Sequence, residues 1–218
     1  MQKYWLKREG NERLILFMLG WACSHRAVSH FLPAGYDVLA VYDYRTIEPF
    51  DPADFASYRS TTLFAWSFGV WAAEQACSAI GLNRAVACNG TPLPVDDRFG
   101  IPRKYLTVTL KGIRQAGMEP FDRKAYGVYY PQMSLQSEER AFGERCEELE
   151  RLVEQASVPY EPRLRWTDAV IGTEDRIFPV ANMSAYWTEK WNGEVLRLPL
   201  PHYPFGDTSL MYNYLQTI

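Results

Sequence analysis

The chain has 218 residues, of which 47% are hydrophobic, 22% charged and 15% aromatic, and its formal net charge is −3. These values are typical of one globular domain with a sizeable core and exclude a disordered, collagen-like or coiled-coil chain. A protein that binds nucleic acid by neutralising phosphates is normally basic, so the charge argues against that class. No apolar run reaches the roughly 18 residues of a membrane span, so we expect none.

The four cysteines form no C-x-x-C pair and no cluster with histidine: they are Cys23, Cys77, Cys88 and Cys146. This pattern argues against structural zinc and favours reduced thiols in a cytoplasmic protein over a disulfide framework. The apolar stretch 14–22 has basic residues before it, as a secretory signal does. However, Glu9 and Glu12 interrupt the leader, and Trp21 stands where a cleavage site needs a small residue. We therefore expect a buried strand there.

In the first ninety residues, apolar runs alternate with helical patterns. Runs typical of buried strands lie at 14–19, 38–42, 61–65 and 84–88. Helices are expected over 24–32, from Asp51 onward and over 69–80. Residues 4–7 and 14–19 also flank a polar turn, Glu9–Asn11, which predicts an edge hairpin. The alternation predicts a mostly parallel central sheet with helices on both faces.

The pattern breaks over residues 92–162, which are rich in charged and aromatic side chains. A helix over 137–157 is expected there, with Phe142, Cys146, Leu149 and Val153 on its apolar face and its glutamates in solvent. The strand–helix alternation then resumes, with strands at 167–172 and 194–198 and helices at 179–189 and 207–216, the last capped by Asp207. We predict a single domain over residues 1–218 with a small inserted cap over residues 92–162.

Three connections that follow strands carry residues suited to nucleophilic catalysis. Ser67 lies in Ala65-Trp66-Ser67-Phe68-Gly69, which matches G-x-S-x-G except for alanine at the first position. Asp175 follows a late strand, with Glu174 as a neighbouring competitor, and His202 follows the final strand. The structural alternatives are a serine that caps the helix, a solvated loop acid and a structural histidine.

Together these residues have the order serine, acid, histidine, which is that of the α/β-hydrolase fold. Each follows a separate strand at the sheet edge where open α/β sheets bind ligands. His202 would take the Ser67 proton as the hydroxyl attacks a carbonyl, and Asp175 would orient the imidazole. The amides of Trp21 and Phe68 would form the oxyanion hole. Asp96 or Asp97, after the fourth strand, is the alternative acid, and Cys23 or Cys88 the alternative nucleophile, with His25 the nearest histidine.

Several of these segments resemble the BioG-type pimeloyl-[acyl-carrier protein] methyl ester esterases of biotin synthesis. The resemblance spans nearly the whole chain and rests on Gly20-Trp21, residues 65–69, residues 172–179 and Pro201-His202-Tyr203-Pro204-Phe205. The related BioH-type esterases usually have histidine before the Gly-Trp pair and glycine at the first elbow position. Here Leu19 and Ala65 stand there, which favours the BioG type.

The resemblance implies a serine esterase that releases pimeloyl-acyl carrier protein and methanol, without a cofactor or a metal. The implied partner is acyl carrier protein bearing methyl pimeloyl-phosphopantetheine. The first half of the predicted cap is basic, with Arg98, Arg103, Lys104, Lys111, Arg114, Arg123 and Lys124, and would steer an acidic partner unless it is an ordinary solvated surface.

The candidate substrate-binding residues are Tyr126, Tyr129, Arg123 and Lys124 in the cap, together with Trp21. The alternative for the tyrosines is that they only pack the cap. The alternatives are a general carboxylesterase or thioesterase on the same fold and a non-catalytic scaffold protein with that fold.

Overall fold

A single sheet of seven strands organises the computed structural model, which describes residues 1–133 and 140–207. The strands are β1 (Gln2–Lys7), β2 (Arg13–Met18), β3 (Asp37–Tyr42), β4 (Ser60–Trp66), β5 (Arg84–Cys88), β6 (Asp168–Gly172) and β7 (Val195–Leu198). Their order is β1-β3-β2-β4-β5-β6-β7, and every pair from β3 to β7 is parallel. The predicted strands and the mostly parallel sheet are therefore confirmed.

The central strands are buried on both faces, which explains their continuous apolar sequences. In β2, Leu14 and Leu16 belong to one hydrophobic cluster, whereas Ile15 and Phe17 belong to the cluster on the opposite face. Successive strand residues point to opposite faces, so a strand covered on both sides needs an apolar residue at every position. Polar functional residues can therefore be placed only at the ends of these strands and in the loops that follow them.

Helices cover one face of the sheet and one end of it. Two of them, α1 (Phe68–Ala76) and α6 (Val180–Glu189), pack their buried residues into one face cluster. The other face carries the short turns η1 (His25–Val28) and η4 (Pro204–Gly206), while η2 (Pro52–Phe55) adds Phe55 to the first cluster. Among the described residues, no helix is both long and apolar enough to cross a membrane.

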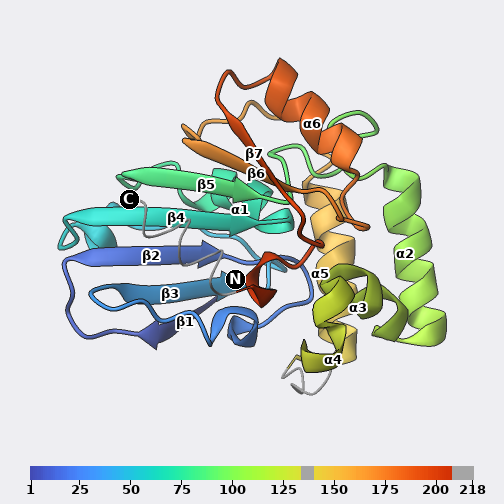
Figure 1. Cartoon of the computed structure of the whole chain (residues 1–218), viewed down its shortest axis with the longest axis horizontal. Helices are drawn as coiled ribbons and strands as arrows, with labels where there is room; N and C mark the ends of the chain where they lie inside the picture. The colour runs from blue at the N-terminus through green and yellow to red at the C-terminus, as the bar shows by residue number, and fades with distance from the viewer. Residues whose placement is uncertain (134–139, 208–218) are drawn as a thin grey trace.

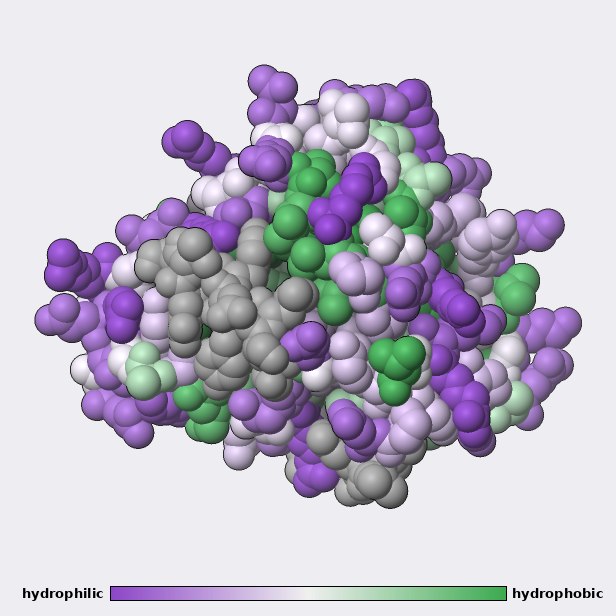
Figure 2. Space-filling model, in the orientation of Figure 1, coloured by the Kyte–Doolittle hydropathy of each residue, from purple (hydrophilic) through white to green (hydrophobic). Residues whose placement is uncertain are grey.

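The segment between β5 and β6 forms its own group of helices. They are α2 (Arg103–Ala116), α3 (Glu119–Tyr126), η3 (Gly127–Tyr129), α4 (Tyr130–Met133) and α5 (Phe142–Gln155). Figure 1 shows α2 to α5 together at one side of the sheet, beyond the ends of β2 and β4. Figure 2 shows hydrophilic side chains over much of the face in view and hydrophobic ones gathered over β6 and β7. The helices occupy the place expected for a cap, whose bounds stay a prediction.

The predicted edge hairpin between residues 4–7 and 14–19 is wrong. β1 pairs antiparallel with β3, and β2 lies between β3 and β4 with parallel neighbours on both edges. Because β2 is buried, both of its edges take central partners, and β1 is left to the outer side of β3. Asp37 at the start of β3 secures the connection, since its Oδ1 accepts the amides of Glu9 and Asn11 at 2.9 and 3.2 Å.

Four predicted helices differ from the structure or leave its described part. The helices expected over 24–32 and from Asp51 onward are only the 3₁₀ turns at His25–Val28 and Pro52–Phe55. In α5 the glutamates do not all face solvent: Glu148 is fully buried, whereas Phe142 is 41% exposed. The helix predicted over 207–216 lies outside the described residues beyond Asp207.

Gly69 in α1 provides a test of the close packing between α1 and the end of β2. A Cβ at Gly69 would lie 2.1 Å from the Met18 carbonyl oxygen, a backbone atom that has no room to move aside. We expect Gly69→Ala to lower the free energy of unfolding by about 3 kcal/mol, as overpacking does. In α2, Gly112 has no atom within 4 Å of such a Cβ. Gly112→Ala should instead stabilise by about 1 kcal/mol, and urea unfolding of both variants checks the contrast.

Asp37 provides a test of pH-dependent stability. Burial alone would raise the pKa of Asp37, but hydrogen bonds from the Glu9 amide, Asn11 and the Tyr58 hydroxyl lower it to about 2. The carboxylate therefore stabilises the fold above pH 4, and this contribution is lost as the pH falls from about 4 through 2. Asp37→Asn should cost about 2 kcal/mol at pH 7 and flatten the acid limb of the unfolding curve. The exposed Asp54→Asn serves as control, and an unchanged acid limb in Asp37→Asn would contradict the expectation.

Candidate active site

Ser67 occupies the sharp turn that joins β4 to α1. Its backbone has φ of 59° and ψ of −127°, a conformation that non-glycine residues adopt only under strong local constraint. Glycines make room for this turn: a Cβ at Gly20 would lie 3.3 Å from the Ser67 Cβ, and one at Gly90 would lie 2.5 Å from the Ser67 carbonyl oxygen. The turn therefore requires small residues on the two neighbouring loops.

The side chains of Ser67, His202 and Asp175 form a continuous chain of hydrogen bonds. His202 Nε2 lies 3.0 Å from Ser67 Oγ, and His202 Nδ1 lies 2.7 Å from Asp175 Oδ2. In the tautomer that suits both contacts, Nδ1 donates to the carboxylate and Nε2 accepts the serine hydroxyl. All three side chains are buried, and the two predicted partners of Ser67 thus meet it from separate loops.

The Asp175 carboxylate is fixed on its other oxygen by the backbone ahead of α6. Asp175 Oδ1 accepts hydrogen bonds from the amides of Ile177 and Phe178, both at 2.8 Å. These bonds orient Oδ2 toward His202. Asp96, the alternative acid, uses its Oδ1 to accept the amides of Arg98 and Phe99 in its own loop. Of the acids considered in the sequence, Asp175 is the one in contact with His202.

The backbone of His202 is held by two residues that the sequence did not single out for this purpose. Trp66 Nε1 donates to the His202 carbonyl at 2.7 Å, and Asn89 Nδ2 donates to the same oxygen at 2.9 Å. Asn89 Oδ1 in turn accepts the Gly172 amide at the end of β6. The sequence signal for this role is an asparagine directly after an apolar strand. The Asn89 side chain is fully buried there and therefore needs hydrogen-bond partners.

The segment that follows β2 lies against the serine. The amides of Trp21 and Phe68 have no hydrogen-bond partner within the part of the chain that the structure describes. Phe68 is the first residue of α1, where unpaired amides and the helix dipole favour negative charge. The Trp21 indole is engaged elsewhere, because its Nε1 donates to the Arg145 carbonyl at 2.7 Å. Two amides therefore remain available beside Ser67.

A cavity of about 790 Å³ opens at these groups and extends between the sheet and the helices α2 and α3. Ser67, His202 and Trp21 line its floor, and Tyr126 and Lys124 line it from α3. Two other predicted contacts are not among the lining residues. Tyr129 packs against Tyr203, and Arg123 pairs with Glu119 at 2.6 Å. Exposed Tyr105 and Val108 of α2 give one wall an apolar surface.

The basic residues predicted for the cap differ in whether they form ion pairs and in whether they line this cavity. Arg98, Arg114 and Arg123 are paired with Glu189, Glu150 and Glu119 respectively. Lys104 and Lys124 line the cavity, and neither forms an ion pair with another described residue. They are therefore available to an anionic ligand. No group of three or more histidine, cysteine or acidic side chains in residues 1–133 and 140–207 is placed to hold a metal ion.

The alternative thiol nucleophiles have less suitable surroundings. Cys88 is fully buried, and burial together with the nearby Asp175 carboxylate raises the pKa of its thiol well above the ordinary value. A neutral thiol is a poor nucleophile. Cys23 lines the cavity, and His25 is the histidine that would have to activate it as a nucleophile. The His25 ring is instead stacked on Tyr4, with a centroid distance of 3.7 Å.

Comparison with known proteins identifies relatives of this chain. Residues 1–208 match the family model described as pimeloyl-ACP methyl esterase BioG. A malonyl-[acyl-carrier protein] O-methyltransferase of Bacteroides fragilis is 34% identical over 194 residues; this chain spans 39% of that protein's length, and the match covers 87% of this chain. The crystal structure of BioG from Haemophilus influenzae superposes with a TM-score of 0.85 at 33% identity, covering 94% of this chain and 95% of that one.

More distant structures share the fold alone. A carboxylesterase structure from Nitrososphaera gargenis has a TM-score of 0.66 at 10% identity, with 99% of this chain and 93% of that chain covered. The predicted α/β-hydrolase fold is confirmed, and the chain is a carboxylic ester hydrolase connected with biotin biosynthesis. The predicted family is confirmed as well: the chain belongs to the BioG family of pimeloyl-ACP methyl esterases.

Proposed function

We propose that this protein hydrolyses the methyl ester of pimeloyl-acyl carrier protein with Ser67 as nucleophile, His202 as general base and acid, and Asp175 as the group that orients His202. The observation that carries the proposal is the hydrogen-bond chain from Asp175 through His202 to Ser67 at the floor of an open cavity. The same arrangement activates serine on several unrelated folds.

The reaction has two halves that use the same groups. Ser67 Oγ attacks the ester carbonyl while His202 Nε2 takes its proton, which gives a tetrahedral oxyanion. The amides of Trp21 and Phe68 stabilise that oxyanion, and His202 then protonates the leaving methoxide to methanol. Water, deprotonated by His202, then attacks the acyl-enzyme. The acyl–Oγ bond breaks, His202 returns the proton to Ser67 Oγ, and the free pimeloyl carboxylate is released on its carrier. No metal or cofactor takes part in this scheme.

The cavity supports a substrate that enters from outside on a carrier. The methyl ester is at the far end of the pimeloyl chain, so that end must reach Ser67 while the carrier stays outside. The apolar wall from α2 suits the acyl chain, and Lys104 and Lys124 suit the phosphate of phosphopantetheine or acids of the carrier. The Bacteroides fragilis relative is named for methyl transfer to a carrier-bound malonyl group. A methyl ester on a carrier is the bond that the proposed reaction removes, and we place that reaction in the cytoplasm.

Substitutions in the hydrogen-bond chain test the proposed catalytic roles. Ser67→Ala should abolish turnover of methyl pimeloyl-acyl carrier protein, because no other nucleophile among the described residues contacts His202. Asp175→Asn should lower kcat by about 10⁴-fold, since the amide favours the wrong histidine tautomer. Asp96→Asn should retain the parent rate and serves as the matched control. Methanol release by purified variants is the measurement, and full activity in Ser67→Ala or Asp175→Asn would refute the assignment.

Charge reversal at the two lysines that line the cavity tests the choice of substrate. A Lys104→Glu, Lys124→Glu double variant should raise KM for the carrier-bound ester about tenfold or more, because two attractive charges become repulsive. Its kcat/KM for p-nitrophenyl acetate should stay within about twofold of the parent value. Added salt should weaken the parent's use of the carrier substrate in the same way.

The control for this charge reversal is Arg59→Glu. Arg59 is exposed and precedes β4, so it lies at the opposite end of that strand from Ser67. It should leave both assays unchanged. If the parent hydrolyses only small esters, the protein is a general esterase and the carrier proposal fails. If it hydrolyses neither substrate, the scaffold alternative is supported.

A further inference from the structure

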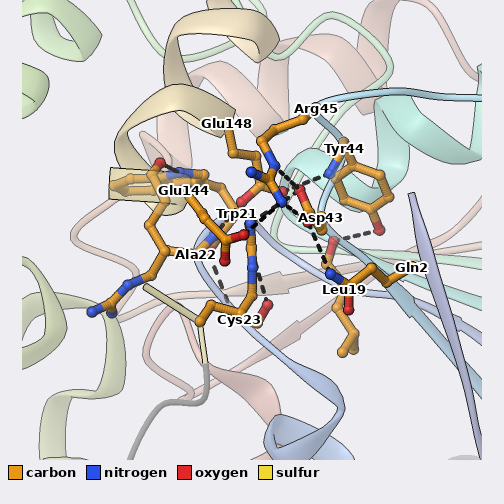
Figure 3. Close-up of polar contacts among 12 residues, drawn as sticks. Gln2, Leu19, Trp21, Ala22, Cys23, Asp43, Tyr44, Arg45, Glu144 and Glu148 are labelled. Carbon is orange, nitrogen blue, oxygen red and sulfur yellow. Dashed lines mark hydrogen bonds and ion pairs between the residues drawn. The ribbon is translucent and has the colours of Figure 1, made fainter. Parts of the chain in front are cut away.

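A buried cluster of charges lies where the loops after β2 and β3 meet helix α5. Glu148 is fully buried, and Asp43 and Arg140 are 4% and 5% exposed. Arg140 Nη1 contacts Glu148 Oε2 at 2.7 Å, and Arg140 Nη2 contacts Asp43 Oδ1 at 3.1 Å. Arg45 adds a second cation, with Nη2 at 2.7 Å from Asp43 Oδ2. Figure 3 shows Glu148, Asp43 and Arg45 close to one another, with residues 21–23 beside them.

Glu148 connects two loops of the sheet to α5 through backbone amides. Its Oε1 accepts the Tyr44 amide at 2.8 Å, and its Oε2 accepts the Ala22 amide at 3.2 Å. Tyr44 follows β3 and Ala22 follows β2, and these strands are neighbours in the sheet. One carboxylate therefore fixes the relative positions of both loops, and a charged acceptor forms stronger bonds than a neutral one.

The loop after β2 is held at three consecutive residues by the segment that contains α5. The Trp21 indole donates to Arg145 O at 2.7 Å, and Arg140 Nη1 donates to Cys23 O at 3.2 Å. Ala22, between them, has φ of 67°. A non-glycine residue keeps a positive φ only where its surroundings impose it. The bond from the Ala22 amide to Glu148 fixes the orientation of the peptide on one side of this Cα.

This geometry has a specific consequence for the proposed chemistry. The peptide that joins Trp21 to Ala22 carries the amide that Glu148 binds, and the Trp21 amide is one peptide earlier. Rotation of Ala22 toward an ordinary conformation would also turn the Trp21 amide relative to Ser67. Burial raises the pKa of the Glu148 carboxyl, and the charge of Arg140 opposes that shift. Arg140 thus helps keep Glu148 in the charged form that binds both amides.

We infer that Glu148, paired with Arg140, is a positioning residue that sets the direction of the Trp21 amide in the oxyanion hole. The inference rests on the proposed function, because only an oxyanion makes that direction matter to the rate. Glu148 does not touch the cavity and acts through the backbone of residues 21–23. The Arg140–Glu148 pair belongs to the segment outside the sheet, so that segment contributes to the rate of the reaction as well as to substrate binding.

A near-isosteric substitution tests the inference. Glu148→Gln removes the charge and replaces one of the two acceptor oxygens with a donor. We expect kcat for p-nitrophenyl butyrate to fall about 10- to 100-fold, as for a misplaced or lost oxyanion donor. Affinity for an alkyl boronic acid, which forms a tetrahedral anion on serine, should fall by a similar factor. Affinity for a neutral alkyl amide of the same length should change less than threefold.

Glu150→Gln is the matched control on the same helix. Glu150 is exposed and pairs with Arg114, so its loss should leave kcat and boronic acid affinity at the parent values. A Glu148→Gln, Arg140→Met double variant leaves no buried cation without its acid and should show the same loss of kcat. It provides the test if the single variant does not fold.

The outcomes separate the two proposals. If the parent hydrolyses esters and Ser67→Ala does not, the proposed function stands whatever happens at Glu148. The inference is then overturned if folded Glu148→Gln retains the parent kcat, or if boronic acid and amide affinities fall equally. If the parent itself lacks ester hydrolysis, the proposed function fails. The Ala22 amide resonance, which should shift on Glu148→Gln, then decides whether the positioning contact exists.

Discussion

The strained backbone of Ser67 is the constraint on which the rest of the site depends. A serine with φ of 59° at the end of a buried strand projects its hydroxyl out of the sheet, at a cost of roughly 1–3 kcal/mol. The surrounding backbone compensates for this strain by close packing. The Ser67 amide donates to the Cys88 carbonyl at 3.0 Å, and Gly69 lets α1 approach the end of β2. Both contacts require parallel neighbours, so the central sheet order is a condition for the serine geometry.

The loops around Ser67 are connected to each other by hydrogen bonds. His202 is positioned twice, through its ring by Asp175 and through its carbonyl by Trp66 and Asn89. Asn89 also binds the Gly172 amide, at the start of the loop that carries Asp175. A displacement of any one loop would therefore move the others. Such coupling is how residues from distant parts of the sequence are held to the tolerances that catalysis demands.

Much of the candidate site could be predicted from the sequence because its signals are local. Ser67, Asp175 and His202 each follow an apolar run, and parallel strands bring their carboxyl ends to one edge of the sheet. The order of the strands in the sheet was harder to predict from the sequence. The polar turn at Glu9–Asn11 is typical of a hairpin, but its partner is Asp37, which is distant in sequence. The glutamate-rich pattern of its helix predicts a solvated Glu148, whereas the side chain is buried against Arg140.

The location of the buried charges argues for a role beyond stability. A buried ion pair adds little net stability, because the loss of hydration offsets the attraction, and apolar residues of similar volume often serve as well. Here the charges do not pair only with each other. Glu148 binds the amides of Tyr44 and Ala22, and Arg140 binds the carbonyl of Cys23. An apolar replacement would fill the same volume but leave those backbone groups unpaired and Ala22 free to relax. The cluster therefore fixes backbone direction, and the direction it fixes is that of the loop that packs against Ser67.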